Sequence, residues 1–326
     1  YNNLGLVYRK KGQLNKALDY LDQSFEIRKK RNDRYHMATI LTNMGLVYTN
    51  QGRLDKALKT HRESLEIWDE IGSVDGKAGA INNIGDVYEK RGQIDEALDN
   101  YLECLDLWKE SENKYGIGIT LNNIGVIYNY KGHFGKALDY LKESLEMRRE
   151  VGDTYSEGLT EKNIGNVYRN MGKLDKAVGR HRKAIDKAEE AGSDKLDISS
   201  KCELAQDYLE LDKINSAGLL IKELLKMKDK IDEPITLIQL YRVAGMVETH
   251  REEYEKAGEY FRKALNKSNE IDNKEGKAKV LYEEGKMREA MGKDFTGKLE
   301  NAKEIFKSGG YEYWASRCEK ALSELD

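Results

Sequence analysis

The chain has 326 residues, 35% of them charged and 39% hydrophobic, and its formal net charge is −3 at pH 7. That balance lacks the basic excess that neutralises phosphates, which argues against nucleic acid or an anionic membrane as a partner, and no apolar run is long enough to span a bilayer. The cysteines Cys104, Cys202 and Cys318 lie too far apart in sequence for a disulfide framework or a metal knuckle. We therefore expect no metal, no cofactor and a reducing, cytoplasmic location.

From the first residues onward, one glycine recurs at intervals of 40 residues. It stands at positions 5, 45, 85, 125 and 165, is replaced by alanine at 205, and returns at 245 and 285. A tyrosine follows three residues after the first six of these positions, and an alanine stands twelve residues after the first seven. Such a fixed period indicates one supersecondary unit stacked on its own copies.

Each copy is predicted to form two helices joined by a turn. In residues 73–112, apolar side chains spaced three or four apart mark one face of each helix: Ile81, Ile84 and Tyr88 in the first, and Ala97, Tyr101 and Leu105 in the second. A glycine such as Gly85 inside the first helix costs about 1 kcal/mol relative to alanine. Its recurrence predicts that a neighbouring helix crosses too closely for a side chain.

The predicted hairpins follow one another in chain order and end in a capping helix. They cover residues 1–32, 33–72, 73–112, 113–152, 153–192, 193–232, 233–272 and 273–311, and the cap covers residues 312–326. The apolar stripe that predicts this cap comprises Trp314, Cys318, Ala321, Leu322 and Leu325.

Helix-capping residues stand at the predicted joints. The hairpins begin at Asp33, Ser73, Asn113, Asp153 and Ser193, which are all suited to an N-cap. Inside the hairpins, Gly92 is suited to a left-handed C-cap, and Asp95 is expected to cap the second helix, with Asp55 and Asp175 in equivalent places.

The recurring residues resemble the tetratricopeptide repeat, whose pattern places Leu-Gly-x-x-Tyr in the first helix and Ala-x-x-x-Phe in the second. The resemblance extends over nearly the whole chain, although the period exceeds the family's usual length of about 34 residues and the closing proline is missing. This longer form is similar to the repeats of kinesin light chains, of spindle-orientation adaptors that modulate G proteins, and of prokaryotic signalling proteins. The resemblance implies an all-α fold, a right-handed superhelical solenoid of about eight hairpins whose first helices line a concave peptide-binding groove.

A recurring asparagine lies on the face of the first helix that is opposite its apolar side. In the third hairpin this face carries Asn83 and Asp86, flanked by Asn82. An asparagine amide offers donors and an acceptor, so one amide per repeat could hold an extended backbone regardless of its sequence. The predicted groove residues are Asn43, Leu46, Asn50, Asn82, Asn83, Asp86, Asn122, Asn123, Val126, Tyr130, Asn163, Asn166, Arg169 and Asn170.

The specificity of this groove would come from residues between the amides. Leu46, Val126 and Tyr130 are apolar or aromatic on a face that is expected to be wet. Carboxylates at Glu203, Glu210 and Glu283 would favour a ligand with some positive charge. In the alternative interpretation, the asparagines satisfy backbone groups of the adjacent helix, and the apolar residues are ordinary surface positions.

Patterns that would indicate catalysis are incomplete. The segment 292–299 is one residue short of a phosphate-binding loop and has Leu299 in place of the required Ser or Thr. His61 and His181 take the aromatic position of the second helix three repeats apart, so they are predicted to be core residues instead of ligands of one metal.

The sequence therefore favours a non-enzymatic adaptor or scaffold that binds a protein or peptide segment in a groove. The alternative is the ligand- or partner-sensing region of a larger signalling protein, such as an ATPase, kinase or transcription factor, whose effector domain lies outside this chain. A third interpretation is self-association of the array.

Overall fold

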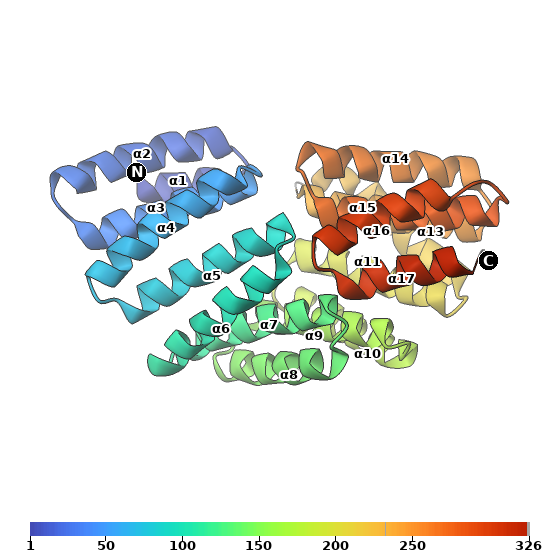
Figure 1. Ribbon diagram of the computed structural model, residues 1–326, viewed down its shortest axis with the longest axis horizontal. Helices are drawn as coiled ribbons and strands as arrows, with labels where there is room; N and C mark the ends of the chain where they lie inside the picture. Colours follow the sequence, from blue (N-terminus) through green and yellow to red (C-terminus); the bar gives the residue numbers. More distant parts are fainter. Residues whose placement is uncertain (232, 325–326) are drawn as a thin grey trace. The chain divides into compact units, whose positions relative to one another are not determined.

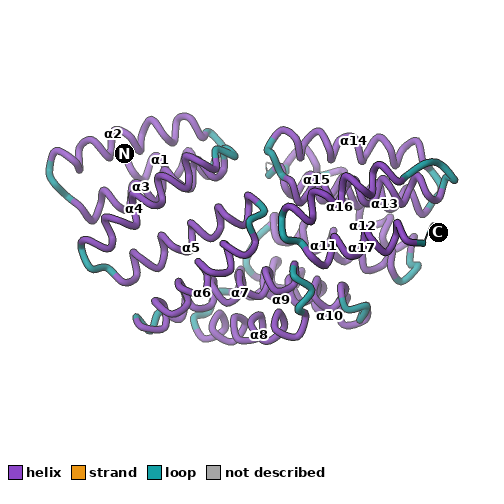
Figure 2. The backbone as a smooth tube through the Cα atoms, viewed as in Figure 1, coloured by secondary structure: helices purple, strands orange, loops and turns teal. Residues whose placement is uncertain are grey.

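The computed structural model describes residues 1–231 and 233–324, and every regular element in those ranges is a helix (Figure 1). Short loops join the helices (Figure 2). No helix in these ranges is long and apolar enough to cross a membrane. The α-helices are α1 (Asn2–Lys10), α2 (Leu14–Lys30), α3 (Arg34–Asn50), α4 (Leu54–Glu70), α5 (Val74–Arg91), α6 (Ile94–Glu110), α7 (Lys114–Tyr130), α8 (Phe134–Glu150), α9 (Thr154–Asn170), α10 (Leu174–Glu190), α11 (Asp194–Glu210), α12 (Ile214–Lys226), α13 (Pro234–His250), α14 (Tyr254–Glu270), α15 (Lys274–Ala290), α16 (Thr296–Ser308) and α17 (Glu312–Ser323), with a 3₁₀ turn η1 (Lys228–Lys230) after α12.

The helices form two compact units, Tyr1–Thr120 and Leu121–Asp326. In each unit a helix packs mainly against the helices before and after it in the chain. In addition, first helices of successive hairpins contact one another directly, α1, α3 and α5 in the first unit, and α9, α11, α13 and α15 in the second. Within each unit, the first helices therefore stand in a row. The prediction of an all-α solenoid of helical hairpins is confirmed.

The repeated glycine marks a close approach between the two helices of one hairpin. A Cβ atom on Gly85 would lie 2.7 Å from the ring of Tyr101, and one on Gly125 would lie 2.6 Å from the side chain of Leu141. Real Cβ contacts are essentially never shorter than 3.0 Å. The predicted close helix crossing is therefore confirmed, and it explains why the helix accepts a residue that weakens it.

The two core histidines also lie at this crossing. The ring of His61 covers Gly45 and that of His181 covers Gly165, and both side chains are fully buried, as predicted. Their polar surroundings differ, however. Neither ring nitrogen of His61 has a hydrogen-bond partner among the described residues, and burial lowers the pKa of His61 to about 4.

The predicted caps between hairpins are confirmed. Asp33, Ser73, Asn113, Asp153 and Ser193 each accept a hydrogen bond from the backbone N–H three residues further on.

Inside the hairpins, the predicted left-handed C-cap at Gly92 is confirmed, but the N-caps predicted at Asp95, Asp55 and Asp175 are wrong. The second helix of the third hairpin begins at Ile94 after Gln93, because the left-handed turn at Gly92 (φ 74°) ends before it, and no side chain caps that helix. Asp95 and Asp55 instead lie in the first turn, where a carboxylate still interacts favourably with the helix dipole. Asp175 has the same position in α10.

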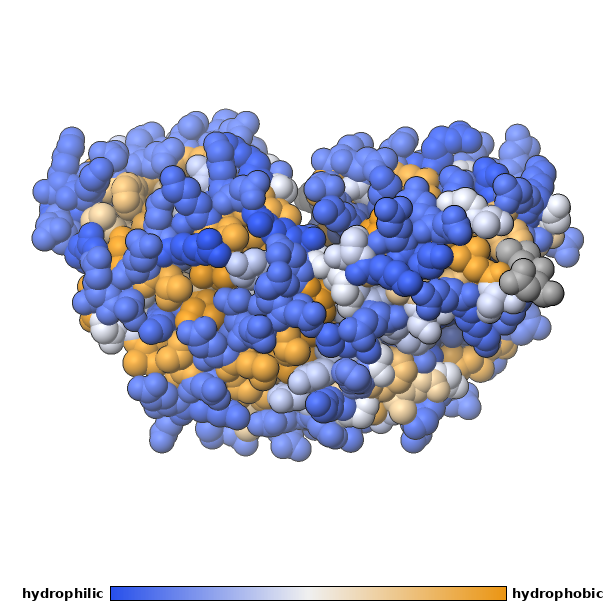
Figure 3. Space-filling model, in the orientation of Figure 1, coloured by the Kyte–Doolittle hydropathy of each residue, from blue (hydrophilic) through white to orange (hydrophobic). Residues whose placement is uncertain are grey.

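The last predicted hairpin has the long turn expected from its sequence, since α15 ends at Ala290 and α16 begins at Thr296. Leu299 is fully buried in α16. The helix α17 follows, with Trp314 and Cys318 buried. The predicted contribution of Leu325 lies outside the described residues. Hydrophilic residues predominate on the face seen in Figure 3, with hydrophobic residues in separate patches between them.

Candidate functional site

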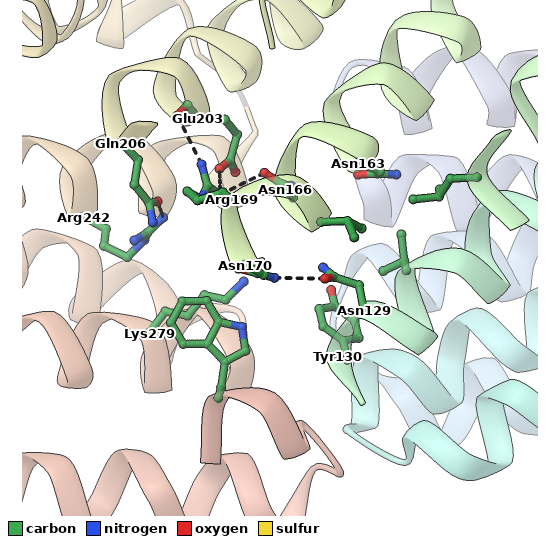
Figure 4. A pocket seen from close by; sticks show the side chains of 14 residues that line it. Asn129, Tyr130, Asn163, Asn166, Arg169, Asn170, Glu203, Gln206, Arg242 and Lys279 are labelled. Atoms are coloured by element: carbon green, nitrogen blue, oxygen red, sulfur yellow. Dashed lines mark hydrogen bonds and ion pairs between the residues drawn. The ribbon is translucent and has the colours of Figure 1, made fainter. Parts of the chain in front are cut away.

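In the second unit, the first helices of five successive hairpins and α17 surround a cavity of about 90 Å³ (Figure 4). Its wall takes residues from α7 and α9 and continues through Glu203 of α11, Arg242 of α13 and Lys279 of α15 to Trp314 of α17. Since a single water needs about 10–15 Å³, the space holds only a few waters. Of the predicted groove residues, the cavity wall includes Val126, Tyr130, Asn163, Asn166, Arg169 and Asn170.

The asparagines of adjacent first helices bond to each other. The Nδ2 atom of Asn163 donates to Oδ1 of Asn122 at 2.9 Å. In the same way, the Nδ2 atom of Asn170 donates to Oδ1 of Asn129 at 2.9 Å, and Figure 4 shows this second bond. Asn122 is buried, and its oxygen also accepts from Thr160 at 3.4 Å. These amides join α7 to α9, so part of their hydrogen-bonding capacity serves the scaffold.

A part of that capacity remains for a ligand. Each amide of Asn163 and Asn170 uses one N–H in the pair. Its second N–H and its side-chain oxygen make no hydrogen bond to another described residue, although both side chains line the cavity. The structural and ligand-binding interpretations of the asparagines are therefore compatible in the same residue.

Behind this row lies a buried ionic network centred on Arg169. Its Nη1 atom lies 3.1 Å from Oδ1 of Asp207, and its Nη2 atom bonds to Glu203 and donates to Oδ1 of Asn166 at 2.9 Å. The second oxygen of Asp207 lies 2.5 Å from Nδ1 of His181. Burial opposes the ionisation of Glu203, but Arg169 and other nearby cations outweigh that effect and lower its pKa to about 2.

This network changes the expected charge of the groove. Glu203 is paired with Arg169, and Glu283 lies 3.8 Å from Nη1 of Arg242. Because these carboxylates are already balanced by arginines, the expected preference for a positively charged ligand is not supported at Glu203 or Glu283.

The remaining groove residues predicted in the second unit surround the same helix pair. Asn123 is half-buried on α7, next to Asn122 and one turn before Val126. The Nδ2 atom of Asn122 lies 3.5 Å from Oδ1 of Asn123. Asn123 is not part of the cavity wall, so its proposed contact with a ligand stays a prediction.

In the first unit, the predicted residues lie along α3 and α5. Asn43 donates to Oδ1 of Asn2 at 2.9 Å, which repeats the amide pairing of the second unit. Oδ1 of Asp86 accepts from the hydroxyl of Tyr101 at 2.7 Å, and burial raises the pKa of Asp86. The other members of the set are half-buried or exposed: Leu46, Asn82 and Asn83 are half-buried, and Asn50 is exposed.

Several residues that line the cavity are absent from the predicted set, and Arg242, Lys279 and Trp314 are three of them. Arg242 occupies the same repeat register as Asn82 and Asn122. The 40-residue period could therefore have identified it as a neighbour of the asparagine row. Lys279 lies earlier on its helix than the residues of that row, and Trp314 comes from α17, outside the predicted array. No periodic signal identifies Trp314.

Comparisons with known proteins agree with this geometry. Family models described as tetratricopeptide repeat match residues 1–73, 77–150 and 162–195. No curated protein matches the chain.

Several solved structures share the fold. The apo form of RapI has a TM-score of 0.67 at 15% identity, with 83% of this chain and 97% of that chain covered. A Rap protein complexed with competence and sporulation factor has a TM-score of 0.66 at 15% identity, with coverage of 89% and 76%. The Rap conjugation gene regulator of the plasmid pLS20, in complex with the Phr* peptide, has a TM-score of 0.60 at 16% identity, with coverage of 96% and 95%. The glycine period, the row of first helices and the family models together show that this chain belongs to the tetratricopeptide repeat family.

Proposed function

We propose that the chain is a non-enzymatic interaction scaffold that binds an extended peptide or protein segment along its first helices, and that the amides of Asn163, Asn166 and Asn170 hold the backbone of that segment. The observation that carries this proposal is the amide row on α9. These three side chains face one cavity. The amides of Asn163 and Asn170 retain hydrogen-bonding groups after their pairing with α7, whereas Oδ1 of Asn166 accepts from Arg169 and its Nδ2 group is left for a ligand.

The pairing itself favours this function. Because Asn122 and Asn129 accept from the amides of α9, the side chains of Asn163 and Asn170 are held in one orientation before a ligand arrives. A preorganised amide loses less rotamer freedom on binding than a free one. The solved structures with the same fold include two complexes, one with competence and sporulation factor and one with the Phr* peptide.

The apolar residues beside the amides would select the side chains of the segment. Val126 and Tyr130 lie on α7 in the cavity wall, next to the row of α9. Their apolar surface beside fixed polar groups is the usual composition of a binding site. In the first unit, Asn43 has the register of Asn163 and Leu46 has that of Val126, so these two residues are proposed to form a contact surface of that unit's own.

A displayed library of random peptides tests the proposal. The full chain and an Asn163→Ala, Asn166→Ala, Asn170→Ala variant are panned in parallel, and selected peptides are measured by calorimetry. We expect peptides that bind the unmodified chain and lose at least about tenfold in affinity on the variant, because each deleted amide removes about 1 kcal/mol of net hydrogen bonding.

A matched control removes two exposed asparagines from second helices, Asn269 of α14 and Asn301 of α16, and should leave binding unchanged. Circular dichroism and thermal unfolding show whether each variant remains folded, and a single Asn170→Ala variant replaces the triple variant if that one unfolds. Selected peptides that bind the triple variant as tightly as the unmodified chain would refute the role of the amides.

A further inference from the structure

The helix α17 contacts the rim of the cavity described above, far from its own position in the chain. The ring of Tyr311 meets the ring of Tyr130 edge to face, with centroids 5.0 Å apart and an interplanar angle of 78°. The ring of Tyr313 meets Phe134 in the same way at 5.2 Å and 80°. These are favourable aromatic geometries, so α17 and Tyr311, the residue directly before it, make specific contacts with α7 and α8.

Polar groups of α17 complete the contact. Oε1 of Glu312 lies 3.1 Å from Nζ of Lys131, and the hydroxyl of Tyr313 donates to the backbone oxygen of Asn170 at 3.2 Å. The residues joined in this way are 181 and 143 positions apart in sequence. Tyr130 and Asn170, two of the predicted groove residues, are thus already in contact with α17.

Trp314 closes the cavity on the same side. It is 7% exposed, and Nζ of Lys279 lies 5.3 Å from the centre of its ring. With this ring in place the remaining space is about 90 Å³, which is too small for a peptide that carries side chains. Displacement of α17 would therefore enlarge the space beside the amides of α9 for such a ligand.

Besides its contacts with α7 and α8, α17 packs on its own neighbours in the chain, since the ring of Trp314 lies 6.0 Å from that of Tyr282 in α15 and 5.7 Å from that of Phe306 in α16. Only Gly309, Gly310 and Tyr311 separate it from α16, and Gly310 has a positive φ of 72°. The contacts of α17 with α7 and α8 are made by the ends of long side chains, which can be released one after another.

We propose that α17 is an internal competitor for the groove of the second unit, and that the ligand is a peptide segment with the chemistry that α17 itself presents, aromatic side chains on either side of a carboxylate. Release of α17 exposes the rings of Tyr130 and Phe134, the ammonium group of Lys131 and the backbone oxygen of Asn170 to that ligand. This inference rests on the proposed function, because it names the ligand class and the regulation of the same site.

The first experiment uses a fluorescein-labelled peptide that copies residues 309–317, Gly-Gly-Tyr-Glu-Tyr-Trp-Ala-Ser-Arg, and measures its binding to the full chain by anisotropy. A Glu312→Lys variant places two cations together at Lys131 and should release α17. Because the affinity for a ligand falls with the fraction of competent molecules, we expect this variant to bind the peptide at least about tenfold more tightly than the unmodified chain.

The matched control is Glu319→Lys, which makes the same charge change on α17 but faces Lys307 of α16. It should bind the peptide no better than the unmodified chain. The inference is overturned if Glu312→Lys gains no more than Glu319→Lys, or if neither variant binds the peptide.

A second variant closes the groove covalently. A Cβ atom on Gly132 would lie 3.7 Å from Cβ of Tyr313, within the range of about 3.5–4.5 Å found in disulfides. A side chain at the positive φ of Gly132 is strained, but Asp212 (φ 58°) and Glu252 (φ 62°) show that the same turn position accepts one in later repeats. In the Gly132→Cys, Tyr313→Cys variant, the reduced form has lost the Tyr313 contacts and should bind the peptide.

After oxidation with diamide, the same protein should bind at least about tenfold more weakly, and reduction should restore binding. Equal binding by the oxidised and reduced forms would overturn the inference. The three native cysteines are fully buried and do not compete for the oxidant in the folded protein.

The two proposals fail in different ways. In one outcome, a library peptide loses affinity for the asparagine variant but binds the oxidised, reduced and Glu312→Lys forms equally. This outcome would support the proposed function and refute the competition by α17. If Glu312→Lys and the reduced double variant bind the copied peptide, and the asparagine variants bind it equally well, the competition by α17 is supported and the role of the amides is refuted.

Discussion

The buried carboxylate of Glu203 is expected to contribute strongly to stability in a manner that depends on pH. The folded protein lowers the pKa of this group from 4.5 to about 2. Since one pH unit corresponds to about 1.4 kcal/mol, the charged form is stabilised by about 3 kcal/mol relative to the unfolded chain. The side chain is only 8% exposed, so solvent screens little of this interaction.

Replacing Glu203 by glutamine keeps the shape of the side chain and removes its charge. At pH 7 we expect the free energy of unfolding to fall by about 3 kcal/mol, because Arg169 retains only Asp207 as a buried counter-charge. The group binds a proton more readily in the unfolded chain than in the folded protein. Its stabilisation is therefore complete above pH 4.5 and is lost as the pH falls from 4.5 towards 2.

Urea unfolding followed by circular dichroism at pH 7, 5, 4 and 3 tests this expectation. The difference between the two proteins should be constant at pH 7 and 5 and should shrink at pH 4 and 3. The control is Glu210→Gln, the same chemical change at an exposed position of the same helix, with an expected effect within about 0.5 kcal/mol. A difference below about 1 kcal/mol at pH 7, or one that does not change with pH, would refute the reasoning.

Three further predictions concern packing and buried groups. Gly165→Ala should lower the free energy of unfolding by about 1–3 kcal/mol, because its Cβ atom would overlap the ring of His181. In contrast, Gly179→Ala in α10, where no atom lies within 4 Å, should raise it by up to about 1 kcal/mol, and urea unfolding measures both. His61→Phe should stabilise the protein, and the gain should be larger at pH 5 than at pH 7.5. Because the pKa of His61 is about 4 in the folded protein and 6.5 in the unfolded chain, the unmodified protein loses stability as the pH falls below 6.5. Equal gains at both pH values would contradict this cause. Burial raises the pKa of Cys104 to about 11, so Ellman's reagent should find no rapidly reacting thiol in the folded protein at pH 8 and all three in denaturant.

The repeat architecture could be predicted from the sequence because its signals are local and recur. A glycine inside a helix is costly unless another helix covers it, so the series that includes Gly85 and Gly125 indicated the crossing of two helices in each hairpin. The residues Asp33 and Asp153 likewise marked helix starts, since a short polar side chain satisfies a nearby backbone donor. The error at Asp95 arose because the preceding turn allows the helix to begin at Ile94, two residues before the start that a cap at Asp95 would give.

The sequence also identified the amide row, although it did not identify what the amides contact. The 3.6-residue period placed Asn163, Asn166 and Asn170 on one face of α9, and the structure brings these three side chains to one cavity. Their pairing with α7 depends on the distance between two helices and on side-chain orientation, neither of which is encoded by spacing along one helix.

Long-range contacts were decided only by the tertiary structure. The pairing of Arg169 with Asp207 and of Lys131 with Glu312 joins residues from different hairpins, and the second pair is 181 positions apart. Such contacts depend on the rotation accumulated over several stacked hairpins and on the direction of the chain after Gly310, so no periodic pattern contains them. The sequence by itself therefore determined the repeated hairpin and the face that carries its amides, whereas the tertiary structure determined which charges are buried and that α17 closes the cavity.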